Sequence, residues 1–110
     1  MIVKTYKDEH GNEPFIDWLE SIKDKTTQVR IRLRLMRIER GSFGDHRSIG
    51  EGLYELRLHF GSGYRIYYGQ VDDEIVLLLA GGDKSTQKQD IQRVKYYWQD
   101  YKWSQKNETI

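Results

Sequence analysis

The fold is decided by residues 52–87, which read GLYELRLHFGSGYRIYYGQVDDEIVLLLAGGDKSTQ. Apolar and polar side chains alternate over 53–60 and again over 64–68, which is the period of strands with one buried face. The glycine-rich turn 61–63 separates these runs, and the acidic pair Asp72-Asp73 precedes the apolar run Ile75–Ala80. The stretch therefore predicts three antiparallel strands joined by short turns.

Turn lengths predict how these strands pair. A three-residue loop at 61–63 sets a register in which every cross-strand pair on one face consists of apolar or aromatic residues. We take this face as the core. The pairs on that face are Phe60–Tyr64, Leu58–Ile66 and Leu56–Tyr68. The opposite face then pairs His59 with Arg65 and Arg57 with Tyr67. A two-residue turn at 72–73 sets Arg65 opposite Ala80 and Tyr67 opposite Leu78.

The flanking segments predict one further strand and three helices. Met1–Tyr6 is apolar and β-branched, as in a strand, and Pro14 suits the first turn of a short helix. Residues 25–40 alternate locally like a strand, yet they run too long without Gly or Pro and are rich in helix formers, so they predict a helix. Residues 41–52 are a glycine-rich loop with room for a short strand at 47–49. Ser85 is a candidate cap for a last helix.

Length and pattern together indicate a single α+β domain. The 110 residues are too few for two cores. We assign residues 1–103 to the domain, with an N-terminal strand and two helices packed on a small antiparallel sheet and a C-terminal helix. The polar residues 104–110 are expected to form a disordered tail.

The composition excludes several classes of protein. Cysteine is absent, which rules out disulfides, thiolate catalysis and cysteine-bound zinc. The N-terminal sequence MIVKTYKDEH has no apolar stretch long enough for a signal peptide, and no segment is apolar enough to span a membrane. We therefore expect a cytoplasmic protein without a membrane partner.

The net charge of +1 hides a strong segregation along the chain. Residues 1–20 carry −3 and residues 61–83 carry −3, whereas residues 21–60 carry +4 and residues 84–110 carry +3. Such basic segments can build a local anion-binding surface in a protein of balanced charge. Charged helix faces that only keep the protein soluble would give the same segregation.

One face of the predicted sheet gathers the residues capable of chemistry. The strand registers put a carboxylate, two arginines, a histidine, a tyrosine and, just past the last strand, a lysine on one surface: Glu55, Arg57, His59, Arg65, Tyr67 and Lys84. Neighbouring arginines repel each other, and their planar guanidiniums suit phosphate oxygens, so an anion is the natural ligand. The competing interpretation is a solvated sheet face with an ion network through Glu55.

Other candidate sites are weaker. His10, His46 and His59 lack the spacing of metal ligands, so no metal site is expected. The run Gly81–Thr86 lacks the glycine spacing of a nucleotide-binding loop. Arg30, Arg34 and Arg37 form a row on the predicted second helix, which is either an exposed face or an extension of an RNA-backbone track.

Three motifs in order resemble the RelE/ParE toxin superfamily, and the closest branch is the HigB-like group of addiction module killer proteins. These motifs are Gly52-Leu53-Tyr54-Glu55-Leu56-Arg57, Gly63-Tyr64-Arg65-Ile66-Tyr67-Tyr68 and Gly81-Gly82-Asp83-Lys84-Ser85-Thr86-Gln87. The resemblance covers about residues 1–100. It implies the toxin of a type II toxin–antitoxin system, neutralised by a cognate antitoxin, that cleaves mRNA on the ribosome without metal or other cofactor. In such enzymes the 2′-hydroxyl attacks the neighbouring phosphate and leaves a 2′,3′-cyclic phosphate.

The resemblance also implies roles for single residues. Arg65 matches the family arginine of the Gly-Tyr-Arg motif, Arg57 a basic position on the preceding strand, and Lys84 a further basic position. His59 and Tyr67 join them as candidate catalytic groups, with Glu55 and Asp90 as further candidates for base or acid. Arg30, Arg34, Arg37 and Gln87 are the candidate RNA-binding residues.

Two departures from the family pattern leave alternatives open. Glu55 stands where the best-studied RelE-type nucleases carry a lysine, and no Tyr or His follows Lys84 by a few residues. The superfamily also includes ParE-type toxins, which bind DNA gyrase and cut no RNA, so the fold does not fix the activity. A non-enzymatic gyrase inhibitor is thus the second hypothesis, and an antitoxin-bound domain that has lost activity is the third.

Overall fold

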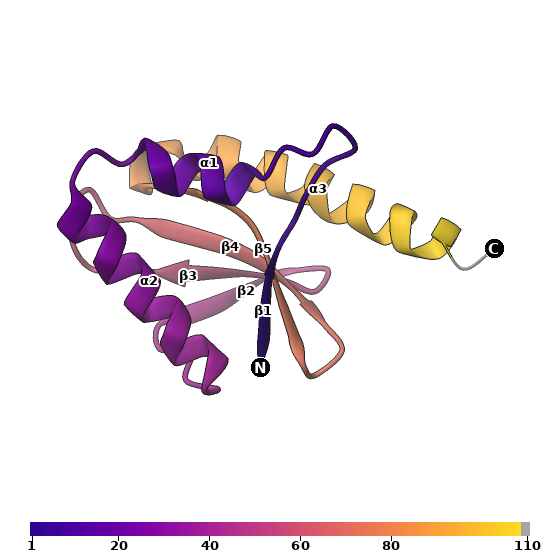
Figure 1. Cartoon of the computed structure of the whole chain (residues 1–110), viewed down its shortest axis with the longest axis horizontal. Coiled ribbons are helices and arrows are strands. Elements are labelled where there is room, and N and C mark those ends of the chain that lie inside the picture. Colours follow the sequence, from indigo (N-terminus) through magenta and orange to yellow (C-terminus); the bar gives the residue numbers. More distant parts are fainter. Residues whose placement is uncertain (109–110) are drawn as a thin grey trace.

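A computed structural model describes residues 1–108, which form a five-stranded mixed sheet packed with helices (Figure 1). The strand order is β1-β5-β4-β3-β2. In chain order the elements are β1 (Ile2–Thr5), α1 (Pro14–Ser21), α2 (Lys25–Glu39), β2 (His46–Gly50), β3 (Leu53–Arg57), β4 (Arg65–Val71), β5 (Ile75–Gly82), the 3-10 turn η1 (Lys84–Thr86) and α3 (Gln87–Glu108).

The predicted α+β fold is confirmed, and the sheet is larger than expected. The possible short strand at 47–49 is real and forms β2, an edge strand antiparallel to β3. The N-terminal strand joins the same sheet, because β1 pairs in parallel with β5 from Ile2↔Ile75 to Thr5↔Leu78. The small antiparallel sheet of the prediction is therefore a mixed sheet.

The predicted register between β3 and β4 is wrong by two residues. Leu56 lies opposite Ile66 and Arg57 opposite Arg65, because the connection includes more than the glycine turn. The Leu58 N–H donates to the carbonyl of Tyr64 at 3.0 Å, which leaves five residues in the loop instead of three. A shift of two keeps the side chains of β3 and β4 on their predicted faces, since the strand period is two.

The register between β4 and β5 also differs from the prediction. Val71 pairs with Ile75, so the turn contains three residues, and an irregularity between Tyr67 and Tyr68 shifts the ladder by one. Tyr67 consequently lies opposite Ala80 and Arg65 opposite Gly82. A bulge of this kind inserts an extra residue into one strand, which sequence alternation does not reveal.

Residues 25–40 form a helix, as predicted, although 29–35 alternate like a strand. Asp24 caps it, with its carboxylate accepting from the Thr26 N–H at 3.0 Å. Ile31 and Ile38, seven residues apart, are the two fully buried side chains of α2. The helix therefore offers one narrow stripe to the core, and most of its arginines face outward.

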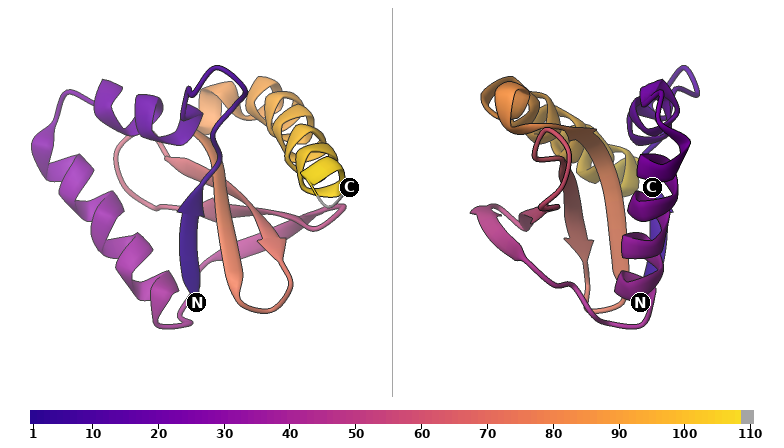
Figure 2. Two further views of the ribbon diagram at one scale, coloured as in Figure 1. Left: turned by 45° about the vertical axis from the view of Figure 1, so that its right-hand side comes forward. Right: turned by 90° about the vertical axis from the view of Figure 1, so that its left-hand side faces the viewer.

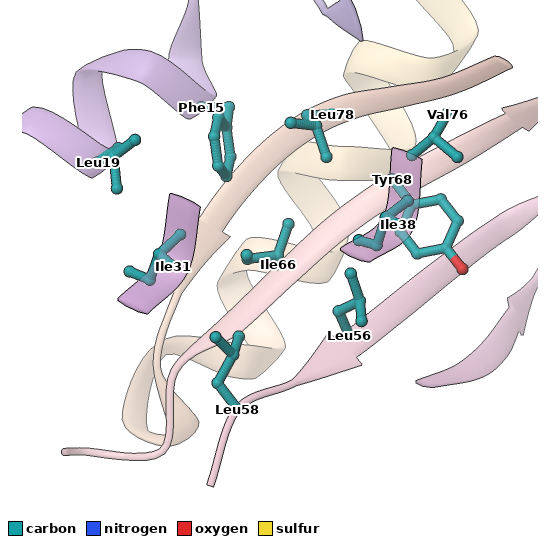
Figure 3. Packing of buried hydrophobic residues seen from close by; sticks show 10 residues of the cluster. All are labelled: Phe15, Leu19, Ile31, Ile38, Leu56, Leu58, Ile66, Tyr68, Val76 and Leu78. Carbon is teal, nitrogen blue, oxygen red and sulfur yellow. The ribbon is translucent and has the colours of Figure 1, made fainter. Parts of the chain in front are cut away.

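Two apolar clusters lie on opposite faces of the sheet, as the views in Figure 2 show with α1 and α2 on one side and α3 on the other. The first cluster, under α1 and α2, includes Phe15, Ile31, Leu56, Ile66 and Tyr68 (Figure 3). The second, under α3, contains Leu53, Tyr67, Leu79, Val94 and Trp98. The face that we expected to be an open chemical surface is thus largely covered by α3.

The C-terminal helix begins and ends differently from the prediction. Asp83, not Ser85, is the N-cap of η1, the turn that leads into α3, since its carboxylate accepts from the N–H groups of Ser85 and Thr86. The predicted disordered tail is wrong for residues 104–108, which continue α3; residues 109–110 lie outside the described residues.

Candidate active site

The two arginines of the predicted site lie directly opposite each other at one end of the sheet. Arg57 is the last residue of β3 and Arg65 the first of β4, and they are paired across the two strands. Residues paired in this way place their Cβ atoms about 4.5–5.5 Å apart on one face. Both side chains are half-buried. The corrected register therefore makes the two arginines direct cross-strand neighbours, whereas the predicted register placed them diagonally.

Lys84 lies beside this pair. Gly82, which pairs with Arg65, ends β5, and Lys84 follows two residues later as the first residue of η1. A Cβ atom built on Gly63 would lie 3.4 Å from the Cβ of Lys84, so the lysine sits against the loop between β3 and β4. Lys84 is exposed. Three cations thus gather at the edge of the sheet where β3 and β5 end and β4 begins.

Asp83 fixes the segment that carries Lys84. Its carboxylate accepts from the hydroxyl of Ser62 at 3.2 Å and from that of Ser85 at 2.6 Å. These bonds and those from the backbone, the Ser85 hydroxyl foremost, hold the pKa of Asp83 below its ordinary value. The ionised carboxylate ties η1 to the β3–β4 loop, so Lys84 and the ends of the two arginine strands keep a fixed relation.

A carboxylate that the sequence did not single out joins this site. Asp45, in the loop between α2 and β2, forms an ion pair with Arg57, with Oδ1 3.0 Å from an Nη atom. Its other oxygen, Oδ2, lies 2.5 Å from Nε2 of His59. The ring of His59 is 73% exposed, which makes it the most accessible of the proposed proton-transfer groups. No motif spacing links Asp45 to Arg57 or His59, so only the tertiary structure could find it.

The other candidate acid–base groups are buried where α3 packs on the sheet, two of them on strands and one on α3 itself. Tyr67, Glu55 and Asp90 are all buried, with exposed fractions of 0%, 0% and 2%. The prediction that Tyr67 and Glu55 belong to the same open surface as the arginines is therefore wrong. They lie on the predicted side of the sheet, but the C-terminal helix covers them.

Burial and hydrogen bonding have opposite effects on the pKa of Glu55, whereas both raise the pKa of Tyr67. Burial raises the pKa of Glu55, but hydrogen bonds from Arg47 and Gln87 and the charges of Arg47 and Arg65 outweigh it, so the pKa lies below its ordinary value. Burial, and then the charges of Glu55 and Asp90, raise the pKa of Tyr67. An ionised Glu55 and a neutral Tyr67 are thus the stable forms near neutral pH.

The predicted RNA-binding residues separate into two kinds. Arg30 and Arg37 are exposed and line a groove of about 320 Å³ between α2 and the end of β3, together with Arg34, Leu33, Leu58, His59 and Phe60. The Arg30 guanidinium lies 3.8 Å above the Phe60 ring. Arg34 is half-buried and donates to the carbonyl of Phe43 at 2.8 Å. Gln87 donates to Glu55 at 2.7 Å. The side chains of Arg34 and Gln87 are therefore both engaged in hydrogen bonds within the protein.

The described part of the chain contains neither a cluster of metal-binding side chains nor a membrane-spanning helix. Within residues 1–108 no three His, Cys, Asp or Glu side chains are grouped so as to hold a metal ion. None of the helices there combines the length and apolar character needed to cross a bilayer.

The fold and the site define a class, and comparison with known proteins places the chain in a family. One chain of the intact E. coli RelBE toxin–antitoxin complex matches with a TM-score of 0.56 at 18% identity, covering 74% of this chain and 94% of that chain. The protein thus has the RelE toxin fold. Residues 17–102 match the family of phage derived proteins that are Gp49-like (DUF891), so the chain belongs to that family.

A relative by sequence is a Haemophilus influenzae protein described as uncharacterised. It is 41% identical over 86 residues, which cover 78% of this chain and 87% of the relative.

Proposed function

We propose that this protein is the toxin of a type II toxin–antitoxin system, of the HigB-like kind, and that it cleaves mRNA as a metal-independent endoribonuclease. The observation that carries the proposal is the direct pairing of Arg57 with Arg65, with Lys84 at the end of the adjacent strand. Three cations at one end of a sheet suit a scissile phosphate.

The proposed cleavage reaction requires neutralisation of the charge on the phosphate and needs no cofactor. When the 2′-hydroxyl attacks the adjacent phosphorus, negative charge develops on the equatorial phosphate oxygens. Positioned arginine and lysine side chains stabilise that charge, and a proton-transfer group serves the attacking oxygen. The Nε atoms of Arg57 and Arg65 are buried without a hydrogen-bond partner among residues 1–108. Buried donors without partners are uncommon in folded proteins, and guanidiniums with unused donors favour an anionic ligand.

The proposed path of the RNA continues from the site along α2. His59 belongs both to the site, through Asp45, and to the groove that Arg30 and Arg37 line. Exposed arginines along a groove bind the phosphate backbone without reading sequence. A cognate antitoxin protein, mRNA and the ribosome are the proposed partners, and the cytoplasm is the proposed location.

Cleavage in the presence of EDTA tests the activity. Pure protein is incubated with an mRNA, with and without ribosomes, and the 3′ ends of the products are analysed. We expect products that end in a 2′,3′-cyclic phosphate. Arg65→Ala should lower the rate by about a hundredfold or more, as loss of a charge-stabilising donor does in other active sites.

Arg32→Ala is the matched control, because it removes the same charge from an exposed position of α2 away from the groove. It should leave the rate within about twofold. Equal activity of Arg65→Ala and the wild type would overturn the assignment of the phosphate site.

The runner-up is a ParE-like toxin that inhibits DNA gyrase by binding it. The ion pair of Arg57 with Asp45 favours this reading, since it partly neutralises one of the three cations. Failure to cleave any RNA, combined with inhibition of gyrase supercoiling, would support it. Failure in both assays would support a domain that has lost activity.

A further inference from the structure

Asp45 holds His59 and Arg57 at once, although it lies more than ten residues before either in the chain. Its Oδ2 atom is 2.5 Å from Nε2 of His59, and its Oδ1 atom is 3.0 Å from Nη2 of Arg57. About a third of the Asp45 side chain is exposed. A single carboxylate therefore connects the most accessible proton-transfer group of the site to one of its phosphate-binding cations.

The backbone of Asp45 is fixed from two sides. Its carbonyl accepts from the Arg57 N–H at 3.0 Å and from the Arg34 guanidinium at 3.4 Å. Gly44 adopts a φ of 67°, and a Cβ atom there would lie 2.5 Å from the Arg34 side chain. The loop before β2 thus folds around Arg34, which leaves the carboxylate little freedom. A carboxylate held in this way can orient a partner instead of following it.

The surroundings keep Asp45 ionised. The hydrogen bond with His59, and then the hydrogen bond and charge of Arg57, lower the pKa of Asp45 against the opposing effect of its partial burial. An ionised carboxylate accepts hydrogen bonds but cannot donate one. The hydrogen of the contact with His59 therefore belongs to the imidazole Nε2.

We infer that Asp45 and His59 form a proton-transfer pair, in which His59 is the catalytic residue and Asp45 its positioning residue. The inference rests on the proposed function. With Nε2–H donated to Asp45, a neutral His59 carries its free lone pair on Nδ1, and that nitrogen is the base. The other candidates for this task have no access to an RNA strand, because Tyr67 and Glu55 are buried beneath α3 and Asp90 is buried on α3 itself.

The step balances without a cofactor. Nδ1 of His59 takes the proton of the attacking 2′-hydroxyl while the bond from O2′ to phosphorus forms. The bond from phosphorus to O5′ breaks with its electron pair, and the leaving 5′-oxygen takes a proton from water. Asp45 stabilises the imidazolium that results, which then returns its proton to solvent. Arg57 and Arg65 remain on the phosphate oxygens throughout.

The first test is a spectroscopic one that needs no activity. The ¹⁵N resonances of the imidazole in labelled wild-type protein report which ring nitrogen carries the proton. We expect the neutral ring of His59 to be the Nε2–H tautomer, and Asp45→Asn to give a mixture of the two tautomers. A wild-type ring protonated mainly on Nδ1 would overturn the inference, whether or not the protein cleaves RNA.

The second test uses cleavage. Asp45→Asn should lower kcat by about ten- to a hundredfold with little change in KM, because the contribution of a positioned base is lost only in part. His59→Ala should lose more, and added imidazole should restore part of its activity. His10→Ala is the matched control, since His10 lies in the exposed turn after β1. This variant should cleave RNA at the wild-type rate.

The outcomes separate the two proposals. A wild type that cleaves, together with an unimpaired His59→Ala variant, refutes the pair and leaves the endoribonuclease proposal intact. A wild type that never cleaves refutes the endoribonuclease proposal and the role of His59 as base, while the tautomer measurement still decides whether Asp45 orients the ring. Asp45→Glu, which keeps the charge but displaces it, serves if Asp45→Asn fails to fold.

Discussion

At the residue scale, position 69 requires glycine because there is no space for a side chain, and not because of its backbone conformation. A Cβ atom built there would lie 2.3 Å from the ring of Trp98, and the φ of Gly69 is not in the left-handed region. The indole cannot easily move away, since its Nε1–H donates to the carbonyl of Glu51 at 2.8 Å and the ring is 5% exposed. Gly69 therefore makes room for the Trp98 ring of α3 to pack directly on β4.

We predict that Gly69→Ala destabilises the protein by about 1–3 kcal/mol, the usual cost of overpacking a core. Urea unfolding measures the change. Trp98→Leu opens space at the same contact, so the double variant should be more stable than the sum of the two single effects. Strict additivity of the two substitutions would show that the steric account is wrong.

At the scale of elements, a buried carboxylate on β3 fastens the start of α3 to the sheet, and a second one, on α3 itself, stabilises the turn that leads into the helix. Glu55 on β3 accepts from Gln87 at 2.7 Å and from Nε of Arg47 at 2.9 Å. Asp90 accepts from the Thr86 hydroxyl and from Arg93, each at 2.6 Å. The helix thus rests on polar anchors at its first turn and on Val94 and Trp98 further along. Glu55, which departs from the pattern of RelE-type nucleases, has a structural role in this protein.

Removing the Glu55 anchor should loosen α3. Glu55→Ala leaves the donors of Arg47 and Gln87 without their acceptor, and we expect a loss of about 2–3 kcal/mol, less than for a fully buried pair because Arg47 is half exposed. Hydrogen exchange should accelerate most in α3.

Glu74→Ala is the comparison for this change, since it deletes an exposed carboxylate in the turn before β5. It should alter stability by less than about 0.5 kcal/mol. If both variants behave alike, Glu55 does not anchor the helix.

At the scale of the whole molecule, groups with shifted pKa values bound the pH range of stability. Hydrogen bonds lower the pKa values of Asp45, Glu55 and Asp83 in the folded state. Burial, before any other cause, raises those of Tyr67 and Tyr68. The carboxylates contribute stability above their unfolded pKa values, and the tyrosines contribute it below theirs.

Stability should therefore fall at both ends of the pH scale. As the pH falls toward the folded pKa values of the carboxylates, the unfolded chain binds more protons and gains population. As the pH rises past the ordinary tyrosine value of 10.0, the unfolded chain releases phenolic protons that the folded core retains.

Denaturant titrations over a series of pH values measure both limbs. Tyr68→Phe should flatten the alkaline limb and leave the acidic one unchanged. An alkaline limb identical to that of the wild type would show that Tyr68 does not contribute to it.

The order of elements and the faces of the strands could be predicted from the sequence. Within β3 and β4, alternation assigned the side chains to the correct faces, because the strand period of two survives a register error of two. Pro14 and the run of helix formers in 25–40 located α1 and α2. The three motifs at 52–87 pointed to the RelE fold that the match to the RelBE complex shows.

Only the tertiary structure decided what covers that face and which groups meet there. Local alternation carries no information about a bulge in β5 or about α3 crossing the sheet, so Tyr67 and Glu55 turned out to be buried. The contact of Asp45 with His59 depends on a loop built around Arg34, and no spacing in the chain encodes it. The short-range sequence pattern determines the secondary-structure elements and the face on which each strand residue lies. Long-range packing determines how deeply a side chain is buried and which groups it contacts, because burial depends on the elements that cover it.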